Sequence, residues 1–287
     1  MNLPFISIII PTYNAAETLE ACLTSILSQT YKNFEIVVID GVSTDNTLVI
    51  LENYSIQLPI KLVSEEDNGI YDAMNKALPI AEGEWLYFLG ADDRLYDEHV
   101  LSNITSKMED GIDIIYGNSV WWPENVKEEG EWDYRQLLKR SINHQRIFYR
   151  SNLFKRVGNY NTRYKIAADY ALNIRLFCEP SVRQEYIDLP VAYYHSGGFT
   201  GNKIDEDFWN DWERISVKSF SPYLSRKEIY LRRGWYCWYN IDKKKYASAF
   251  YLFCTIYKNT FSYPFVKHTI SQIKQTIKRG LNRKEIV

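Results

Sequence analysis

Apolar runs of four to six residues alternate with helical patterns over the first 116 residues, and this alternation restricts the folds open to the chain. It predicts an α/β domain with a mostly parallel sheet, flanking helices and right-handed crossovers. Ligands of such sheets bind beyond the carboxyl ends of the strands, so the loops after the strands are the place to look for a site. The expected strands are Phe5–Ile10, Phe34–Ile39, Ile60–Val63, Trp85–Leu89 and Ile112–Tyr116, and the expected helices are about Asn14–Gln29, Asn46–Tyr54, Ile70–Leu78 and Asp97–Met108.

The chain after residue 116 has a weaker pattern. The segment Val120–Glu131 is acidic and irregular, and we expect it to form loops over the crevice. A short strand is expected at Ile147–Tyr149 and a helix at about Ala167–Phe177. Further strands are expected near Tyr186 and Val191. This part continues the same domain as mixed structure rather than as a regular alternation.

The strand Trp85–Leu89 is followed by the small pair Gly90–Ala91 and then by two adjacent carboxylates, Asp92 and Asp93. Two acids at the end of a strand can hold a hard divalent cation, because Mg²⁺ is usually bound by one or two carboxylates plus substrate phosphates. The alternative is that the pair caps the helix that follows. This stretch alone leaves both interpretations open.

The net charge of −2 conceals a division along the chain. Residues 1–225 carry 20 Lys/Arg against 33 Asp/Glu, whereas residues 226–287 carry 14 against 3. The predicted helix Asp242–Asn259 has an apolar run too short to span a bilayer, and Val266–Leu281 reads as a basic amphipathic helix. We therefore expect a first domain at 1–203 and a helical extension at 204–287 that contacts an anionic membrane surface. The alternative is a helix packed on the body with a solvated basic face.

Composition points to an intracellular protein. The four cysteines show no paired spacing, which favours a reduced compartment. The start of the chain lacks a basic region followed by an apolar core, so no secretory signal is expected. Nucleic-acid binding is not expected either, because the basic charge lies on an apolar helical tail rather than in a folded groove. These features predict a cytoplasmic protein, peripheral on the inner face of the cell membrane.

Four loop motifs follow one another, each at the carboxyl end of an expected strand: Ser7–Asn14 (SIIIPTYN), Val38–Asp45 (VIDGVSTD), Glu65–Lys76 (EEDNGIYDAMNK) and Leu89–Asp93 (LGADD). Together they resemble family 2 of the glycosyltransferases, and the resemblance covers roughly residues 5–200. It implies the GT-A fold and an inverting, nucleotide-sugar-dependent transferase. The closest likeness is to bacterial enzymes that build O-antigen, capsule or exopolysaccharide.

The resemblance implies a set of donor-binding residues. Tyr13 is expected to stack on the nucleotide base and Asp40 to accept a hydrogen bond from the base ring, although an Asp after a strand also forms turns. The helix that starts after Gly69 suits an anion through its free N–H groups. The full set is Pro11, Thr12, Tyr13, Asn14, Asp40, Asp67, Gly69, Asn75 and Asp92.

A divalent cation, Mn²⁺ or Mg²⁺, is implied at the family's variable "DxD" position, which here reads Ala-Asp-Asp. Asp93 is expected to be the direct ligand, with Asp92 near the ribose and the metal. The departure from the motif leaves open which carboxylate binds more tightly. His195 could be a further metal or phosphate ligand, but a histidine at the end of a strand is often structural.

Asp169 matches the family's general base, the group that takes the proton from the acceptor hydroxyl. The alternative is an ordinary first-turn acid that complements the helix dipole. His144 is a rival base, because imidazole titrates near neutrality. The pair His144–Gln145 also matches a recurrent family pair, where contacts with the acceptor are expected.

The sequence therefore predicts a metal-dependent hexosyltransferase that moves a sugar from a nucleotide-sugar to a lipid-linked or oligosaccharide acceptor in bacterial surface polysaccharide synthesis. UDP is the expected nucleotide, because the family that the chain resembles commonly uses UDP-sugars. One alternative is a sugar-phosphate nucleotidyltransferase, which would need a Gly-rich first loop with Arg and Lys where this chain has Pro-Thr-Tyr-Asn. The other is a non-catalytic nucleotide-sugar-binding scaffold of a polysaccharide assembly complex.

Overall fold

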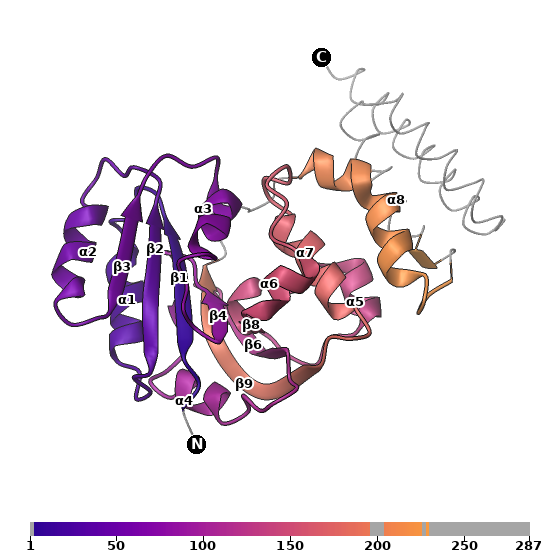
Figure 1. The fold of residues 1–287 in the computed structure, drawn as a ribbon, viewed down its shortest axis with the longest axis horizontal. Coiled ribbons are helices and arrows are strands. Elements are labelled where there is room, and N and C mark those ends of the chain that lie inside the picture. The colour runs from indigo at the N-terminus through magenta and orange to yellow at the C-terminus, as the bar shows by residue number, and fades with distance from the viewer. Residues whose placement is uncertain (1–2, 196–203, 226–227, 230–287) are drawn as a thin grey trace, which may run out of the picture. The chain divides into compact units, whose positions relative to one another are not determined.

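The computed structural model describes residues 3–195, 204–225 and 228–229 (Figure 1). The chain forms two compact units, one made of residues 1–133 and 141–205 and the other of residues 134–140 and 206–287. The division predicted after residue 203 stays a prediction.

A mixed sheet forms the centre of the first unit. Its described strands lie in the order β3-β2-β1-β4-β8-β6-β9-β5, and β7 pairs with β6. The strands are β1 (Ile6–Thr12), β2 (Phe34–Asp40), β3 (Ile60–Ser64), β4 (Trp85–Phe88), β5 (Arg94–Leu95), β6 (Ile114–Trp122), β7 (Val126–Glu128), β8 (Ile147–Arg150) and β9 (Gln184–His195). The helices are α1 (Leu19–Leu27), α2 (Thr47–Ser55), α3 (Ile70–Ala77), α4 (Val100–Thr105), α5 (Tyr134–Lys139), the 3₁₀ helix η1 (His144–Arg146), α6 (Asn152–Val157), α7 (Ala168–Phe177) and α8 (Glu206–Phe220).

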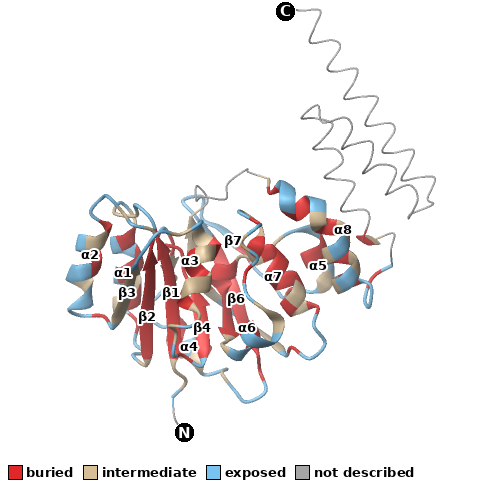
Figure 2. Cartoon of the chain, turned by 45° about the horizontal axis from the view of Figure 1, so that its top comes forward, coloured by how far each residue is buried: buried red, intermediate tan, exposed pale blue. Residues whose placement is uncertain are grey.

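The sheet has a parallel half and a mixed half. Strands β3, β2, β1 and β4 are parallel neighbours, and Figure 2 shows β1, β2 and β4 as buried. Burial on both faces is what allows their nearly continuous apolar sequences. Strand β8 is antiparallel to β4 and β6, and β9 is parallel to β6. The predicted α/β fold class with flanking helices is confirmed, but the sheet is mixed rather than mostly parallel, because β8 runs antiparallel to both of its neighbours.

Helices α1, α2 and α4 cover one face of the sheet. Their apolar residues form one buried cluster with strand residues such as Ile8, Ile10 and Val38. Complete burial of such a side chain is worth about 1.5–3 kcal/mol. These helices therefore hold the parallel strands in place from one side.

Helices α3 and α6 and the loop before α7 pack on the other face through aromatic side chains. Phe88 of β4 lies edge-on to Tyr160, with ring centroids 5.3 Å apart. Tyr71 of α3 stacks on the same ring at 5.5 Å. Such pairs contribute about 0.5–1.5 kcal/mol beyond their area burial. This packing fixes α3 against the segment that leads to α7.

The prediction that the first helix begins at Asn14 is wrong. Asn14 and Glu17 have the spacing of a capping box, but α1 begins at Leu19. The backbone of Asn14 is left-handed, with φ 48°, and its side-chain oxygen accepts a hydrogen bond from the Thr44 backbone N–H at 2.8 Å. A tertiary contact between two loops therefore replaces the local cap.

Three predictions for segments after residue 96 are also wrong. The segment Val120–Glu131 does not form loops throughout, because β6 continues to Trp122 and pairs with β7 in a hairpin. The strands expected near Tyr186 and Val191 are a single strand, β9. Helix α4 is much shorter than the expected Asp97–Met108. Helices α5 and α6 were not predicted.

The described part of the second unit consists of α5 and α8. Helix α8 buries Phe208, Trp212 and Phe220 completely, and Tyr134 of α5 stacks on Tyr223 with ring centroids 4.9 Å apart. Within the described residues, no helix has the length and apolar character needed to cross a membrane. The helices predicted after residue 241 and their membrane contact lie outside the described residues.

Candidate active site

The carboxyl ends of several strands meet at one edge of the sheet and bring the predicted residues there. Thr12 ends β1, Asp40 ends β2 and His195 ends β9. Asp92 follows β4, which runs in the same direction as these strands. The edge is the one at which open α/β sheets bind ligands.

Asp40 is buried and holds the donor-side loops together. Its carboxylate accepts hydrogen bonds from Thr12 Oγ1 at 3.1 Å, the Ser43 backbone N–H at 2.9 Å and Ser64 Oγ at 2.7 Å, and a further one from the Ser43 hydroxyl. Burial alone would raise the pKa of Asp40, but these hydrogen bonds lower it below its ordinary value. A carboxylate has about four acceptor sites, and all are used. Its predicted contact with the nucleotide base stays a prediction.

Tyr13 and Asp67 converge on Gly41. Tyr13 is 65% exposed at the end of β1, so its ring is open to a planar ligand. A Cβ atom on Gly41 would lie 3.3 Å from the Tyr13 ring and 2.7 Å from Asp67 Oδ2. Because Gly41 has no side chain, Tyr13 and Asp67 can lie this close to its backbone. Pro11, also assigned to the donor site, is buried within β1.

Helix α3 begins at the same edge. Gly69 precedes it with φ 113°, a value that favours glycine, and its N–H donates to Asp67 Oδ1 at 2.7 Å. Asn75 lies further along α3, where its amide donates to the Tyr160 carbonyl at 2.9 Å and accepts from the Tyr160 N–H at 3.0 Å. The Asn75 side chain therefore stabilises packing, and its donor role stays a prediction.

Asp92 and Asp93 lie in different environments. Asp93 is 3% exposed, and its carboxylate accepts from Gln145 Nε2 at 2.7 Å and from the His195 backbone N–H at 2.9 Å. Burial, followed by the charge of Asp92, raises the pKa of Asp93 to about 6. Asp92 is exposed. The alternative that the pair caps the next helix is wrong, because α4 begins at Val100.

The acidic pair fits part of a divalent cation site. His195 Nδ1 lies 3.8 Å from Asp92 Oδ2 and has no hydrogen-bond partner among the described residues. Carboxylate and imidazole are suitable ligands for first-row divalent metals, and a cation would offset the repulsion that raises the pKa of Asp93. The described residues contain no group of three His, Cys, Asp or Glu residues placed to hold a metal. Diphosphate oxygens and water would have to complete the ligand set.

Asp169 lies in the first turn of α7, where the helix dipole stabilises its charge. Its Oδ2 is 3.3 Å from His144 Nδ1, and its Oδ1 is 3.0 Å from the hydroxyl of Tyr71. Burial, followed by the charge of Asp169, raises the pKa of Tyr71 well above its ordinary value. His144 is buried, and its Nε2 has no hydrogen-bond partner among the described residues.

His144 and Gln145 connect the two acidic centres. These consecutive residues form the start of η1. The first contacts Asp169 and the second donates to Asp93. A candidate base and a candidate metal-binding carboxylate are therefore held by one short turn, an arrangement suited to a reaction between a phosphorylated donor and a protic acceptor.

The sequence interpretation gave no role to two residues that position this site. Asp205 Oδ2 accepts from the Ile166 and Ala167 backbone N–H groups at 2.8 and 3.1 Å, so it stabilises the start of α7. Tyr71 donates to the Ile166 carbonyl at 2.7 Å as well as lying beside Asp169. No local signal marks Asp205, which lies 36 residues after Asp169.

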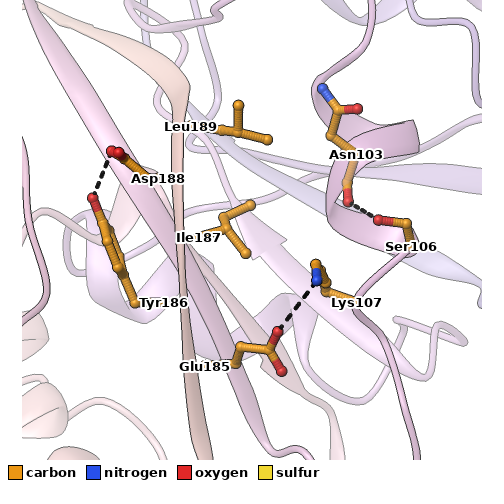
Figure 3. Close-up of a pocket in the computed structure, with 8 residues that line it drawn as sticks. All are labelled: Asn103, Ser106, Lys107, Glu185, Tyr186, Ile187, Asp188 and Leu189. Atoms are coloured by element: carbon orange, nitrogen blue, oxygen red, sulfur yellow. Dashed lines mark hydrogen bonds and ion pairs between the residues drawn. The ribbon is translucent and has the colours of Figure 1, made fainter.

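A separate pocket lies away from this edge (Figure 3). It is lined by Asn103 of α4, by Lys107 just after that helix, and by the first half of β9, including Glu185 and Leu189. His195, at the candidate site, is at the other end of β9. Lys107 and Glu185 form an ion pair at 3.9 Å across this pocket. The convergence of titratable groups makes the strand edge a better candidate for the active site than this pocket.

The family described as "Glycosyl transferase family 2" matches residues 7–171. A relative from Mycobacterium bovis (strain BCG / Pasteur 1173P2), the "PGL/p-HBAD biosynthesis glycosyltransferase", is 42% identical over 214 residues, which is 72% of this chain and 84% of the relative.

Two solved structures show a shared fold. S. aureus TarS 1-349 in complex with UDP-GlcNAc superposes with a TM-score of 0.65 at 23% identity, covering 80% of this chain and 69% of the TarS 1-349 chain. The mannosyltransferase PcManGT from Pyrobaculum calidifontis, in complex with GDP-Man and Mn²⁺, superposes with a TM-score of 0.56 at 17% identity, covering 97% of this chain and 87% of PcManGT.

Proposed function

Because the chain belongs to glycosyl transferase family 2 and has the GT-A fold, we propose that it transfers a sugar from a UDP-sugar to a hydroxyl group, with inversion at the anomeric carbon. The proposed acceptor is a lipid-linked or oligosaccharide molecule in bacterial surface glycoconjugate synthesis. The observation that carries this proposal is the turn His144–Gln145, which contacts both Asp169 and Asp93. The UDP-GlcNAc complex of TarS supports a nucleotide-sugar donor.

In the proposed reaction, the acceptor oxygen attacks the anomeric carbon while the bond from that carbon to the diphosphate oxygen breaks. Asp169 takes the proton of the acceptor hydroxyl, and the nucleoside diphosphate leaves with the bonding electrons. His144 and Tyr71 orient the Asp169 carboxylate through their contacts with its two oxygens. His144 is the second candidate for the base, because its Nε2 is unpartnered among the described residues.

Asp92, with Asp93 and His195 beside it, would hold a divalent cation against the donor diphosphate. A bound Mn²⁺ or Mg²⁺ stabilises negative charge on the leaving group. The Mn²⁺ in the PcManGT complex supports this assignment. The donor nucleotide is proposed to lie between this pair and Tyr13, beside Asp67 and the start of α3.

A thermal-shift panel tests the proposed function directly. The full chain is heated with UDP-, GDP-, CDP- and dTDP-sugars, each with and without Mn²⁺. A ligand at 100 times its Kd stabilises the native state by about 2.7 kcal/mol, so we expect a UDP-sugar with Mn²⁺ to raise the Tm by several degrees. No shift with any donor would contradict the proposal. Donor binding without hydrolysis or transfer would favour the non-catalytic scaffold.

We further propose that residues 204–287 bind the inner face of the cell membrane through their basic, aromatic sequence. The support is the charge division, with 14 Lys/Arg against 3 Asp/Glu after residue 225. Deletion of residues 264–287 is expected to move the protein from the membrane fraction to the soluble fraction. Unchanged partitioning would reject this part of the proposal.

A further inference from the structure

Val42 has a backbone conformation that its side chain disfavours. It lies in the loop after β2 with φ 61°. This left-handed region is uncommon for any residue other than glycine, and for a β-branched residue it is a real outlier. The Val42 side chain is also 45% exposed. A glycine at this position would remove both the strain and the exposed apolar surface.

Hydrogen bonds on either side of Val42 hold it in this conformation. Asp40 accepts from the Ser43 backbone N–H at 2.9 Å and also from the Ser43 hydroxyl. Ser43 Oγ in turn accepts from the Asn14 backbone N–H at 2.8 Å. The Gly41 N–H donates to the Thr12 carbonyl at 2.8 Å. Strained residues persist where their surroundings determine them, and they concentrate at functional sites.

The loop that contains Val42 lies beside the ring of Tyr13. A Cβ on Gly41, the residue before Val42, would lie 3.3 Å from the Tyr13 ring. Tyr13 and Val42 are both exposed apolar groups, on two loops that are joined by several hydrogen bonds. A base stacked on Tyr13 would therefore lie beside this second loop.

We propose that Val42 is a specificity-determining residue of the donor site, whose isopropyl group packs against the edge of the nucleotide base stacked on Tyr13. The inference rests on the proposed function, because it needs a nucleotide at this edge of the sheet. Val42 is held in a strained conformation so that its side chain contacts the base. The contact adds apolar burial on binding, and the hydrogen-bonded loops keep it preformed.

The test compares Val42→Gly with the wild-type chain. Isothermal titration gives the Kd for UDP, GDP, CDP and dTDP, and for inorganic pyrophosphate with Mg²⁺. We expect Val42→Gly to raise the Tm, because strain is relieved. We also expect it to raise the Kd of the nucleoside diphosphate that the wild-type chain binds most tightly, by about tenfold. Pyrophosphate affinity is expected to stay the same, because pyrophosphate has no base.

Two further variants make the result decisive. Val42→Asn keeps a side chain that tolerates the left-handed conformation but loses the apolar contact, so we expect the same loss of affinity. Val49→Ala removes apolar surface from another exposed valine, on α2, and should leave every Kd unchanged. Wild-type affinity in Val42→Gly or Val42→Asn, or an equal loss for pyrophosphate, would overturn the inference while leaving the proposed function intact. No nucleotide binding by the wild-type chain would overturn both.

Discussion

The two halves of the sheet bring residues to the same edge in different ways. In the parallel half, β3-β2-β1-β4, each polar loop follows the strand that positions it, as with Asp40 and Asp92. In the mixed half, β8 runs antiparallel to β4, so its amino end lies at this edge. His144 and Gln145 therefore come before their strand. The donor residues can therefore be found by looking at the carboxyl ends of the predicted strands. The acceptor-side residues His144 and Gln145 cannot be found in this way.

The two halves are joined by specific side-chain contacts. Gln145 before β8 donates to Asp93 after β4 at 2.7 Å. Asn75 of α3 pairs with both backbone groups of Tyr160 in the segment before α7. The donor and acceptor sides can therefore be perturbed separately, by changing residues that belong to one half, or together, by changing these contacts.

The largest expected effect comes from the mixed half. Asp169→Asn should lower the rate of transfer, or of donor hydrolysis, by about 10²–10⁴-fold, because the general base is lost. The Kd for UDP should not change, because Asp169 contacts His144 and Tyr71, neither of which is a proposed donor-binding residue. Steady-state kinetics and calorimetry measure the two quantities.

His144→Gln is the matched variant for this prediction. As a positioning residue, His144 should matter less than Asp169, with a loss of about tenfold, and the acid limb of the pH–rate profile should be kept. A loss greater than that of Asp169→Asn would make His144 the base, with Asp169 as its orienting partner.

A smaller effect is expected on the donor side. The Cβ atom in Gly41→Ala would lie 2.7 Å from Asp67 Oδ2, so the Asp67 carboxylate must move. We expect the Kd for UDP to rise about tenfold, which is about 1.4 kcal/mol, with kcat nearly unchanged. Asp67→Ala and the double variant Gly41→Ala/Asp67→Ala complete a double-mutant cycle. Additive losses in that cycle would mean that the added methyl group does not act through Asp67.

The regular part of the fold follows from local patterns. The positions of β1, β2 and β4 and the site loops after them were predicted within a few residues, because parallel strands buried on both faces leave an apolar run that ends at a polar loop. The four loop motifs also resembled the correct family. The pair Asp92-Asp93 could be proposed as a site for the same reason, whereas the role proposed for Asp40 came from the family resemblance.

The rest depends on contacts between distant residues. Helix α1 begins later than predicted, because the Asn14 side chain accepts a hydrogen bond from Thr44, 30 residues away, instead of capping the helix. Asp205 stabilises the start of α7 from 38 or 39 residues away. The roles proposed for His144 and Asp169 came from the family resemblance, because no local pattern indicates that the two side chains meet.

Asn75→Ala tests the contact between the halves. The change leaves the Tyr160 N–H and carbonyl without their partner, which costs about 1–3 kcal/mol when such groups are buried. We expect the Tm to fall by several degrees, because 1 kcal/mol corresponds to about 2–4 °C in a domain of this size. Asn46→Ala is the control, since Asn46 makes no capping hydrogen bond and is exposed. A normal Tm with weakened UDP binding would instead support the predicted donor role of Asn75.

The smallest effect is expected from the end of β2 that faces away from the site. Glu35 is 3% exposed, and it bonds to Lys61 Nζ and Ser7 Oγ at 2.7 and 2.6 Å. Burial alone would raise the pKa of Glu35, but these contacts lower it below its ordinary value of 4.5. The stability contributed by the Glu35 carboxylate is therefore present above pH 4.5 and is lost as the pH falls through the lower folded pKa.

Glu35→Gln should flatten the acid limb of the stability profile and leave the Kd for UDP unchanged. Asp40, at the other end of β2, also has a lowered pKa, so Asp40→Asn should flatten the same limb. Asp40→Asn should also weaken the binding of UDP, because Asp40 holds the loops of the donor site in place. Denaturant titrations between pH 3 and 7, with UDP binding measured at pH 7, compare the two variants. Equal effects of both variants on UDP binding would mean that the two ends of β2 do not differ in function.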